Sequence, residues 1–264
     1  MSAPDSRDSD ARENRARANV VHVDVDVVRM SEVVDIVMGW SRGTRVRSAI
    51  GVNAYVCNMA TTNRRFRADV AAADLAYADG QSIVWAARSL GHDLPERIAT
   101  TDLIEPLAAA AADQHVKLFF FGAAPGIAQL AADRLAAANA GLEIETHDGF
   151  VTPDAMPALV AQINASGAGI LLVGLGDPLQ QRWVAEHRDE LTVPAILTCG
   201  GLFDWISGSH RRAPAWMIRA GLEWLWRFMI EPRRLARRYL LGNPAFIARV
   251  TRQRLFSRRS NGRS

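Results

Sequence analysis

The chain has 264 residues, of which 49% are hydrophobic and 22% are charged, and its formal net charge is +3. This length and composition can bury a sizeable core, which excludes an intrinsically disordered protein. No window holds the roughly 18 consecutive apolar residues that a membrane-spanning helix needs. Residues 1–18 alternate acids and arginines without the apolar centre of a secretory signal, so we expect a disordered leader and a soluble or peripheral protein.

The charge is unevenly distributed along the chain. From Ser207 onward there are 14 arginines and two acids, so this segment carries +12 and the preceding residues carry −9. The basic segment is also rich in tryptophan, which is typical of binding to an anionic surface, either phospholipid headgroups or nucleic acid. The composition predicts an α/β core at 19–206, a basic aromatic appendage at 207–250 and a flexible basic tail at 251–264.

Cysteine and histidine usage argues against a metal centre. Cys57 and Cys199 stand alone in apolar surroundings, and we interpret both as buried thiols in a reducing compartment. The six histidines have no metal-binding spacing, and no G-x-S-x-G elbow is present. None of the glycine turns is a G-x-G-x-x-G dinucleotide fingerprint or a G-x-x-x-x-G-K-S phosphate loop. The sequence therefore predicts no metal, no cofactor and no serine hydrolase.

Apolar runs that end in glycine alternate with alanine-rich helical stretches, which favours an α/β fold with a parallel sheet. In chain order we expect a strand at 20–28, a helix at 31–40 with a serine cap, a strand at 47–53, an interrupted helix at 61–78 and a helical run at 81–91. Strands then begin near residues 116, 143, 168 and 193, and helices begin near residues 125, 154 and 178.

Ligands of such folds bind beyond the carboxyl ends of the strands. The expected strand ends carry Asn53, Gly122, Gly176 and the segment 200–204. The loop 122–126 can present backbone N–H groups to a phosphate, or it can be a tight turn that only requires glycine. Spacing alone favours the turn.

Two aspartates are open to two interpretations. Asp79 follows a predicted helix and precedes the helical run at 81–91, so its carboxylate can cap that run or act as a general base. Residue spacing favours the cap. Asp204 can close a turn or accept hydrogen bonds from the hydroxyls or base of a ligand.

Several segments, taken together and in order, resemble the WecG/TagA/CpsF family of glycosyltransferases from about residue 21 to 246. The most specific part is GGLFDWISGSHRRAPAWMIRAGLEWLWRFMIEPRRLARRYLLGNPAF at 200–246, which is similar to the family's Gly-Gly-Phe-Asp turn, RAP tripeptide, GLEWL segment and EP-R-R-L-RRY ending. Upstream, VNA, ADG, ERI followed by TDL, FFFGAAPG, HDGF and GLGDPLQQRW match the remaining blocks.

The resemblance implies a Rossmann-like core and an inverting, metal-independent transfer of an N-acetylmannosamine-type sugar from a UDP donor to an undecaprenyl-diphosphate-linked sugar. Asp79 matches the family's proposed base, Asp204 would hold the nucleoside, and arginines of the appendage would grip the diphosphate, because a guanidinium can hold two phosphate oxygens. The substrate-binding residues implied by the matched blocks are Asn53, Arg97, Asp102, Gly122, Gly176, Gln180, Asp204, Arg212, Arg233, Arg234, Arg237 and Arg238.

The implied partners are the UDP-sugar, the lipid-linked acceptor and an anionic membrane surface, with the protein peripheral at the cytoplasmic face of the plasma membrane. The amphipathic appendage would lie in the interface. The oligomeric state, a homo-oligomer included, is left open. One alternative is a nucleic-acid-binding protein with salt-dependent affinity, which leaves the α/β body without a role. Another is a catalytically altered membrane scaffold.

Four positions depart from the family pattern. The family usually has threonine at the position of Gly51 and glycine at that of Thr100. It usually has lysine and glutamate at the positions of Leu179 and Gln181. These departures leave the donor sugar open, whereas the aspartate at position 79 is kept.

Overall fold

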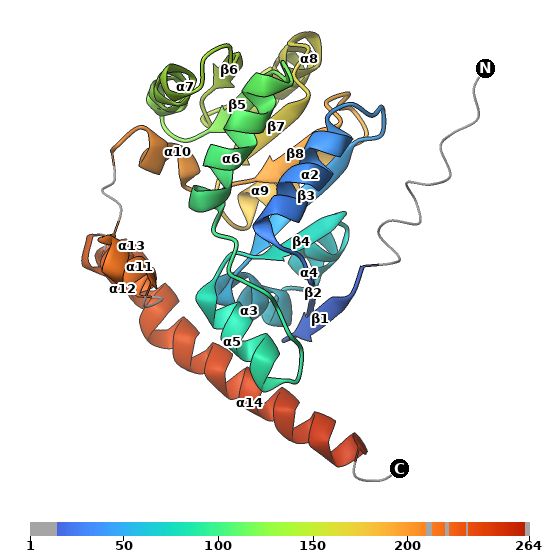
Figure 1. Cartoon of the computed structure of the whole chain (residues 1–264), viewed down its shortest axis with the longest axis vertical. Coiled ribbons are helices and arrows are strands. Elements are labelled where there is room, and N and C mark those ends of the chain that lie inside the picture. The colour runs from blue at the N-terminus through green and yellow to red at the C-terminus, as the bar shows by residue number, and fades with distance from the viewer. Residues whose placement is uncertain (1–14, 210–212, 220–221, 231, 262–264) are drawn as a thin grey trace, which may run out of the picture.

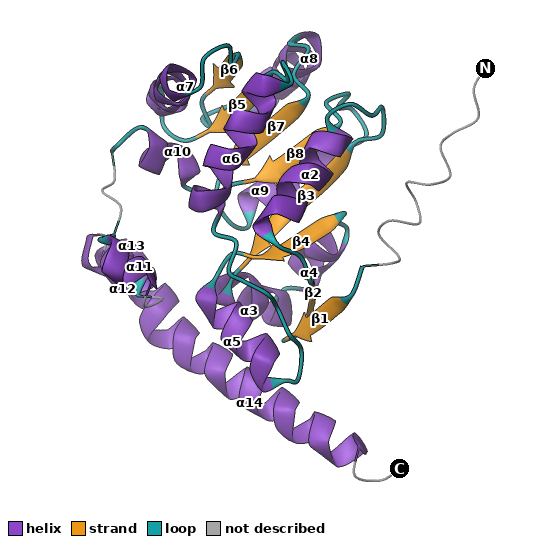
Figure 2. Cartoon of the chain, viewed as in Figure 1, coloured by secondary structure: helices purple, strands orange, loops and turns teal. Residues whose placement is uncertain are grey.

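The computed structural model describes residues 15–209, 213–219, 222–230 and 232–261. An all-parallel sheet of six strands in the order β4-β3-β8-β7-β5-β6 forms the centre of the molecule, with helices on both faces (Figures 1 and 2). The predicted Rossmann-like α/β core is confirmed. The sheet strands are β3 (Arg47–Val52), β4 (Leu75–Ala78), β5 (Leu118–Gly122), β6 (Ile144–His147), β7 (Ile170–Gly174) and β8 (Ala195–Thr198).

Alternate residues of each strand point to the two covered faces, which explains the continuous apolar runs. In β5, Leu118 and Phe120 pack with α2 (Met30–Trp40), α6 (Thr100–Asp113), α7 (Ile127–Ala138) and α10 (Leu202–Ile206). Phe119 and Phe121 pack on the other face with α8 (Met156–Ala165) and α9 (Leu179–His187). A short 3-10 turn (Pro153–Ala155) leads into α8.

The expected strand at 20–28 is instead part of a hairpin. Strands β1 (Arg17–Val20) and β2 (Val23–Asp26) are antiparallel and lie outside the main sheet. Val21 and His22 form the turn with φ values of 50° and 66°, a conformation that β-branched residues rarely adopt. The carboxamide of Gln253 accepts a hydrogen bond from the Val21 N–H at 2.8 Å, so a residue far along the chain fastens this turn.

The interrupted helix expected at 61–78 is wrong in its second half. Helices α3 (Ala54–Thr62) and α4 (Arg64–Ala71) break at Asn63, as expected, but β4 follows them. The short run Leu75–Ala78 is fully buried between β3 and the hairpin, and this tertiary burial overrides the helical preference of its alanines. The segment after it, α5 (Gln81–Ser89), is a helix as expected.

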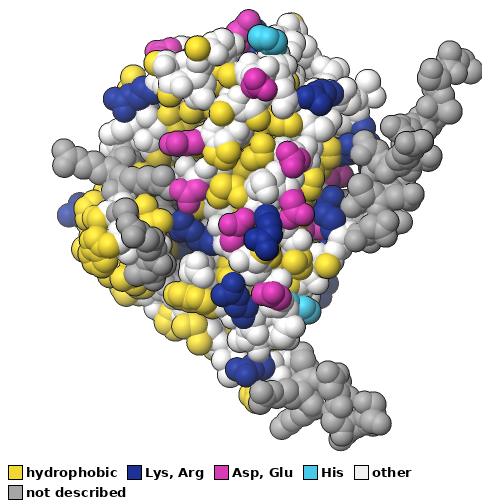
Figure 3. Space-filling model, viewed as in Figure 1, with side chains coloured by type: hydrophobic (Ala, Val, Ile, Leu, Met, Phe, Trp, Pro, Cys, Tyr) yellow, Lys and Arg dark blue, Asp and Glu magenta, His cyan; other side chains and the backbone are white. Residues whose placement is uncertain are grey.

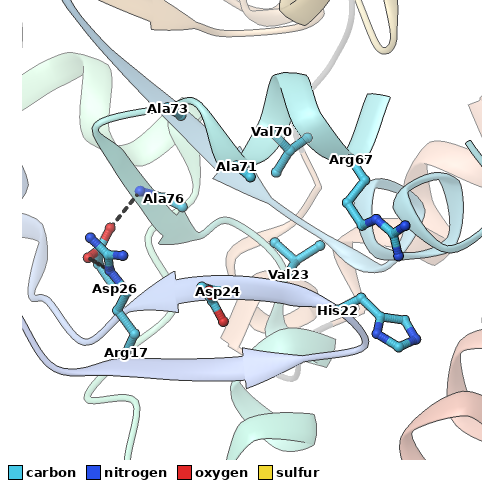
Figure 4. Close-up of a pocket in the computed structure, with 10 residues that line it drawn as sticks. All are labelled: Arg17, His22, Val23, Asp24, Asp26, Arg67, Val70, Ala71, Ala73 and Ala76. Carbon is cyan, nitrogen blue, oxygen red and sulfur yellow. Dashed lines mark hydrogen bonds and ion pairs between the residues drawn. The ribbon is translucent and has the colours of Figure 1, made fainter. Parts of the chain in front are cut away.

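Two buried carboxylates, those of Asp26 and Asp74, hold the hairpin and the amino ends of the strands in place. Asp26 accepts the backbone N–H of Ala76 at 2.8 Å and forms ion pairs with Arg15 and Arg17. A small pocket lies beside this contact, between the hairpin and α4, with Asp26 turned toward the amide of Ala76 (Figure 4). Asp74 accepts a hydrogen bond from the Arg188 guanidinium at 2.6 Å. None of these groups belongs to the predicted substrate-binding set.

The carboxyl-terminal part of the described chain is helical. It comprises α11 (Ala215–Arg219), α12 (Glu223–Ile230), α13 (Pro232–Ala236), a π-helical turn η2 (Arg237–Leu241) and α14 (Gly242–Asn261). Helix α14 packs against α3 and buries Phe246 and Val250 in the core. The predicted boundary at residue 250 falls inside α14.

These helices leave large apolar side chains exposed. Figure 3 shows them gathered over the region of α11, α12 and α13. The exposed apolar residues of this part are Trp216, Trp224, Met229, Ile230, Leu240, Leu241, Ile247, Leu255 and Phe256. In the part of the chain that the structure describes, no helix combines the length and apolar character needed to cross a membrane.

Candidate active site

Asn53 and Asp79 lie side by side at the carboxyl edge of the sheet. Strands β3 and β4 are paired in register through Val52 and Ala78, and each of the two polar residues follows directly. The Asp79 N–H continues the ladder by donating to the Val52 carbonyl at 2.9 Å. The Asn53 amide nitrogen lies 3.4 Å from Asp79 Oδ2 and donates to it. The sequence had separated these residues into different structural contexts, whereas the parallel pairing brings them together.

Asp79 does not cap the helix that follows it. Gly80 is the N-cap of α5, and no side chain hydrogen-bonds there. Instead, Asp79 Oδ1 accepts the backbone N–H of Thr100 at 3.0 Å and its hydroxyl at 3.3 Å. Thr100 is the first residue of α6, so the carboxylate lies at the positive end of that helix. The cap interpretation is therefore wrong for α5, and this half-buried carboxylate is held by a helix distant in sequence.

The side chain of Asn53 also caps α3. Its Oδ1 accepts the backbone N–H groups of Tyr55 at 3.0 Å and Val56 at 3.2 Å. The amide is thereby fixed with its nitrogen toward Asp79. Arg238 reaches the same group from η2: its guanidinium lies 3.5 Å from Asn53 Oδ1 and 4.4 Å from the centre of the Tyr55 ring.

A second polar cluster follows β7. The Asp177 Oδ1 atom accepts hydrogen bonds from Gln180 at 2.8 Å and Gln181 at 2.6 Å. The side-chain oxygen Oε1 of Gln180 accepts the Gly200 N–H at 2.9 Å, which ties the start of α9 (Leu179–His187) to the loop after β8. The Oε1 atom of Gln181 is buried without a hydrogen-bond partner in the described residues. Gln180 thus lies in the first turn of α9, beside the loop after β8, and its contact with a substrate stays a prediction.

Asp177 was missed in the sequence analysis. Burial raises the pKa of its carboxyl group, the Gln181 and Gln180 amides and the Arg238 charge oppose that rise, and the charge of Asp79 adds to it. These electrostatic couplings join the cluster after β7 to the pair at β3 and β4. The signal in the sequence was a carboxylate between Gly176 and Pro178, just past a strand end, where this fold binds ligands.

The glycines at the strand ends permit close backbone approach. Gly122 has a φ of 140°, and a Cβ on it would lie 2.4 Å from the Gly174 carbonyl oxygen. A Cβ on Gly174 would lie 2.7 Å from the ring of Phe203, the residue before Asp204 in α10. Asp204 is half-buried in the first turn of that helix. Gly176, with a φ of 76°, shapes the turn before Asp177. The turn interpretation of Gly122 therefore has a structural reason, and a phosphate contact stays a prediction.

The remaining predicted residues are spread more widely. Arg97 and Asp102 form an ion pair with each other at 2.9 Å, between the loop before α6 and its first turn. Arg233 is exposed on α13. Arg212 lies outside the described residues, as do the side chains of Arg234 and Arg237. Within the described ranges, no group of three or more His, Cys, Asp or Glu side chains is arranged to hold a metal ion.

Both cysteines are free and buried, as predicted. Burial raises the pKa of each thiol well above its ordinary range, so both remain protonated at neutral pH. Neither Cys57 nor Cys199 is therefore a candidate nucleophile, and the half-buried Asp79 is the best-placed group for proton transfer at the edge of the sheet.

A family model matches the chain over nearly its whole length. The model described as "Glycosyl transferase WecG/TagA/CpsF family" matches residues 18–260. The match includes nearly all of the β1–β2 hairpin, all six strands of the sheet and the helices into α14. It therefore covers every residue of the polar clusters at the strand ends. This chain belongs to the WecG/TagA/CpsF family of glycosyltransferases.

Proposed function

We propose that the protein transfers a sugar, of the N-acetylmannosamine type, from a UDP donor to an undecaprenyl-diphosphate-linked sugar, in the synthesis of a cell-surface polysaccharide or teichoic-acid-like polymer. The observation that carries the proposal is the carboxylate of Asp79. Thr100 holds one of its oxygens, and the other faces the Asn53 amide at the carboxyl edge of the sheet. A carboxylate held in this way can serve as a general base.

In the proposed reaction, the acceptor hydroxyl gives its proton to Asp79 Oδ2 while its oxygen attacks the anomeric carbon of the donor. The bond between that carbon and the diphosphate oxygen breaks, and UDP leaves with the electron pair. A single displacement inverts the configuration of the anomeric carbon. Charge on the departing diphosphate requires stabilisation, and Arg238, which already lies against Asn53, supplies a guanidinium near the site.

The other substrate contacts follow from the same placement. Gln180, in the first turn of α9 and hydrogen-bonded to the loop after β8, would contact the donor. Asp204 would accept hydrogen bonds from the nucleoside, since α10 starts just beyond the carboxyl end of β8. Arg97 and Asp102, which pair with each other, would flank the pocket at the start of α6. Arg233 and the other appendage arginines would close over the diphosphate.

The exposed apolar side chains of the carboxyl-terminal helices support peripheral binding to the cytoplasmic face of the plasma membrane. Apolar residues next to arginines are typical of a surface that docks on anionic headgroups, each basic residue contributing about 1 kcal/mol. Docking there would bring the enzyme to an acceptor whose lipid tail stays in the bilayer.

The test is UDP release by the purified full-length protein with a soluble lipid-diphosphate-N-acetylglucosamine analogue. UDP-ManNAc, UDP-ManNAcA, UDP-Glc and UDP-GlcA are offered in parallel, with anionic liposomes present. We expect acceptor-dependent release from one donor by the wild type, loss of release in Asp79→Asn, and full release in Asp189→Asn. Asp189 is the matched control because its exposed carboxylate follows α9, away from the site. Equal activity of the wild type and Asp79→Asn would refute the assigned base, and no release from any donor would refute the proposed reaction.

A further inference from the structure

The hydroxyl of Thr100 lies between a buried phenol and the carboxylate of Asp79. Thr100 Oγ1 is 3.0 Å from the Tyr77 hydroxyl and 3.3 Å from Asp79 Oδ1. Burial, together with the charge of Asp79, raises the pKa of Tyr77 above its ordinary range, so the phenol keeps its proton and can donate. If Tyr77 donates to Thr100, the threonine hydroxyl is free to donate to Asp79. The three groups then form one directed chain of hydrogen bonds.

The three hydrogen-bonded groups occupy the space into which a side chain at position 51 would project. A Cβ on Gly51 would lie 3.0 Å from the Asp79 Cβ, 3.2 Å from the Tyr77 ring and 3.3 Å from Thr100 Oγ1. Distances this short are tighter than ordinary van der Waals contact, so any side chain at position 51 would push against all three groups. Gly51 has an ordinary strand conformation and is paired with Tyr77, so the reason for glycine here is space rather than backbone freedom.

The Thr100 hydroxyl lies within contact distance of the place where a side chain at position 51 would begin. Gly51 and Thr100 are therefore spatial neighbours, although they are far apart in the sequence.

We infer that Thr100 is a positioning residue for Asp79, and that Gly51 leaves the space in which the Thr100 hydroxyl lies against the carboxylate. The inference rests on the proposed role of Asp79 as the base. By engaging Oδ1 through both its N–H and its hydroxyl, Thr100 fixes the rotamer of the carboxylate. Among the described residues the other oxygen has only the long contact with Asn53, so it is left for the acceptor proton.

The inference is tested with Thr100→Gly, which removes the hydroxyl, and Gly51→Ala, which fills the space beside it, using the UDP-release assay. We expect each variant to lower kcat by about tenfold or more with a small change in KM, because a misplaced base affects the transition state more than substrate binding. Thr100→Ser, which keeps the hydroxyl, should stay close to the wild type. A merely structural role would not make kcat depend on the hydroxyl in this way.

Two results would overturn the inference. One is an equal loss of kcat in Thr100→Ser and Thr100→Gly, and the other is unchanged kcat in Thr100→Gly when Asp79→Asn is inactive. Crystal structures of the variants give a readout that does not depend on catalysis. We expect the Asp79 rotamer to change in Thr100→Gly and to be kept in Thr100→Ser. If the wild type transfers no sugar, the proposed function fails, whereas an unchanged rotamer in Thr100→Gly refutes the positioning role itself.

Discussion

The two tasks of Asn53 can be separated by a pair of substitutions. Its Oδ1 caps α3 by accepting two backbone N–H groups, and its amide nitrogen donates to Asp79. Asn53→Ala removes both interactions. Asn53→Ser keeps a good N-cap, because serine and asparagine are about equally favourable there, but its shorter side chain cannot reach Asp79. Comparing the two variants therefore separates the effect of Asn53 on stability from its effect on catalysis.

The expected magnitudes differ for the two tasks. Loss of the cap should cost about 1 kcal/mol in the free energy of unfolding, which corresponds to a fall in Tm of roughly 2–4 °C for a domain of this size. Loss of a hydrogen bond worth about 1 kcal/mol should lower kcat/KM by roughly fivefold. Thermal unfolding followed by circular dichroism and initial rates of UDP release measure the two effects. We expect Asn53→Ala to lose both properties and Asn53→Ser to lose activity only. A serine variant as unstable as the alanine variant, or one with full activity, would refute this reasoning.

Three further predictions concern stability. The raised pKa of Asp177 means that the folded state binds its proton more readily than the unfolded state, so stability falls as pH rises through the folded pKa. Asp177→Asn should therefore raise Tm at about pH 8. The difference in Tm between the variant and the wild type should disappear below the ordinary carboxyl pKa of about 4. A larger gain in Tm at acid pH than at pH 8 would contradict this direction of the pKa shift. Gly174→Ala should cost about 1–3 kcal/mol in urea denaturation, because its methyl group meets a phenyl ring at 2.7 Å. The control Gly39→Ala, in a helix with open space around it, should stabilise by about 0.5–1 kcal/mol. Arg188→Ala should cost about 1–3 kcal/mol, since it removes a donor 2.6 Å from the buried Asp74 carboxylate, and an unchanged denaturation midpoint would show that this contact contributes nothing.

The positions of most sheet strands along the chain could be predicted from the sequence, because long apolar runs such as Leu118–Gly122 have few alternatives, whereas their order in the sheet was not predicted. Strand β4 could not be predicted, because its four residues have no alternation and lie within an alanine-rich stretch. Its identity depends on burial between β3 and the hairpin, which no local pattern reports. The hairpin turn was missed for a similar reason, since a valine with positive φ is stabilised by Gln253.

For the site, the resemblance implied roles for Asn53 and Asp79, but it did not predict the contact between them. Local spacing assigned Asp79 to the helix that follows it, and the structure places it at the start of α6 instead. Contacts between residues separated by more than 20 positions, such as this one, depend on strand order. Asp177 escaped notice because its importance comes from burial and from the charges around it, which appear only after folding.

The docking of α14 has a consequence for how the chain is made. The Gln253 side chain holds the Val21 amide across 232 positions, and the Asn58 amide donates to the Gly242 carbonyl across 184. During synthesis, the apolar faces of α3 and the hairpin therefore stay uncovered until the residues of α14 (Gly242–Asn261) have left the ribosome. Contacts between such distant residues form late, and exposed apolar surface invites aggregation in the meantime. Helix α14 thus covers this apolar surface late in synthesis, and a nascent chain that still lacks α14 should depend most on chaperones.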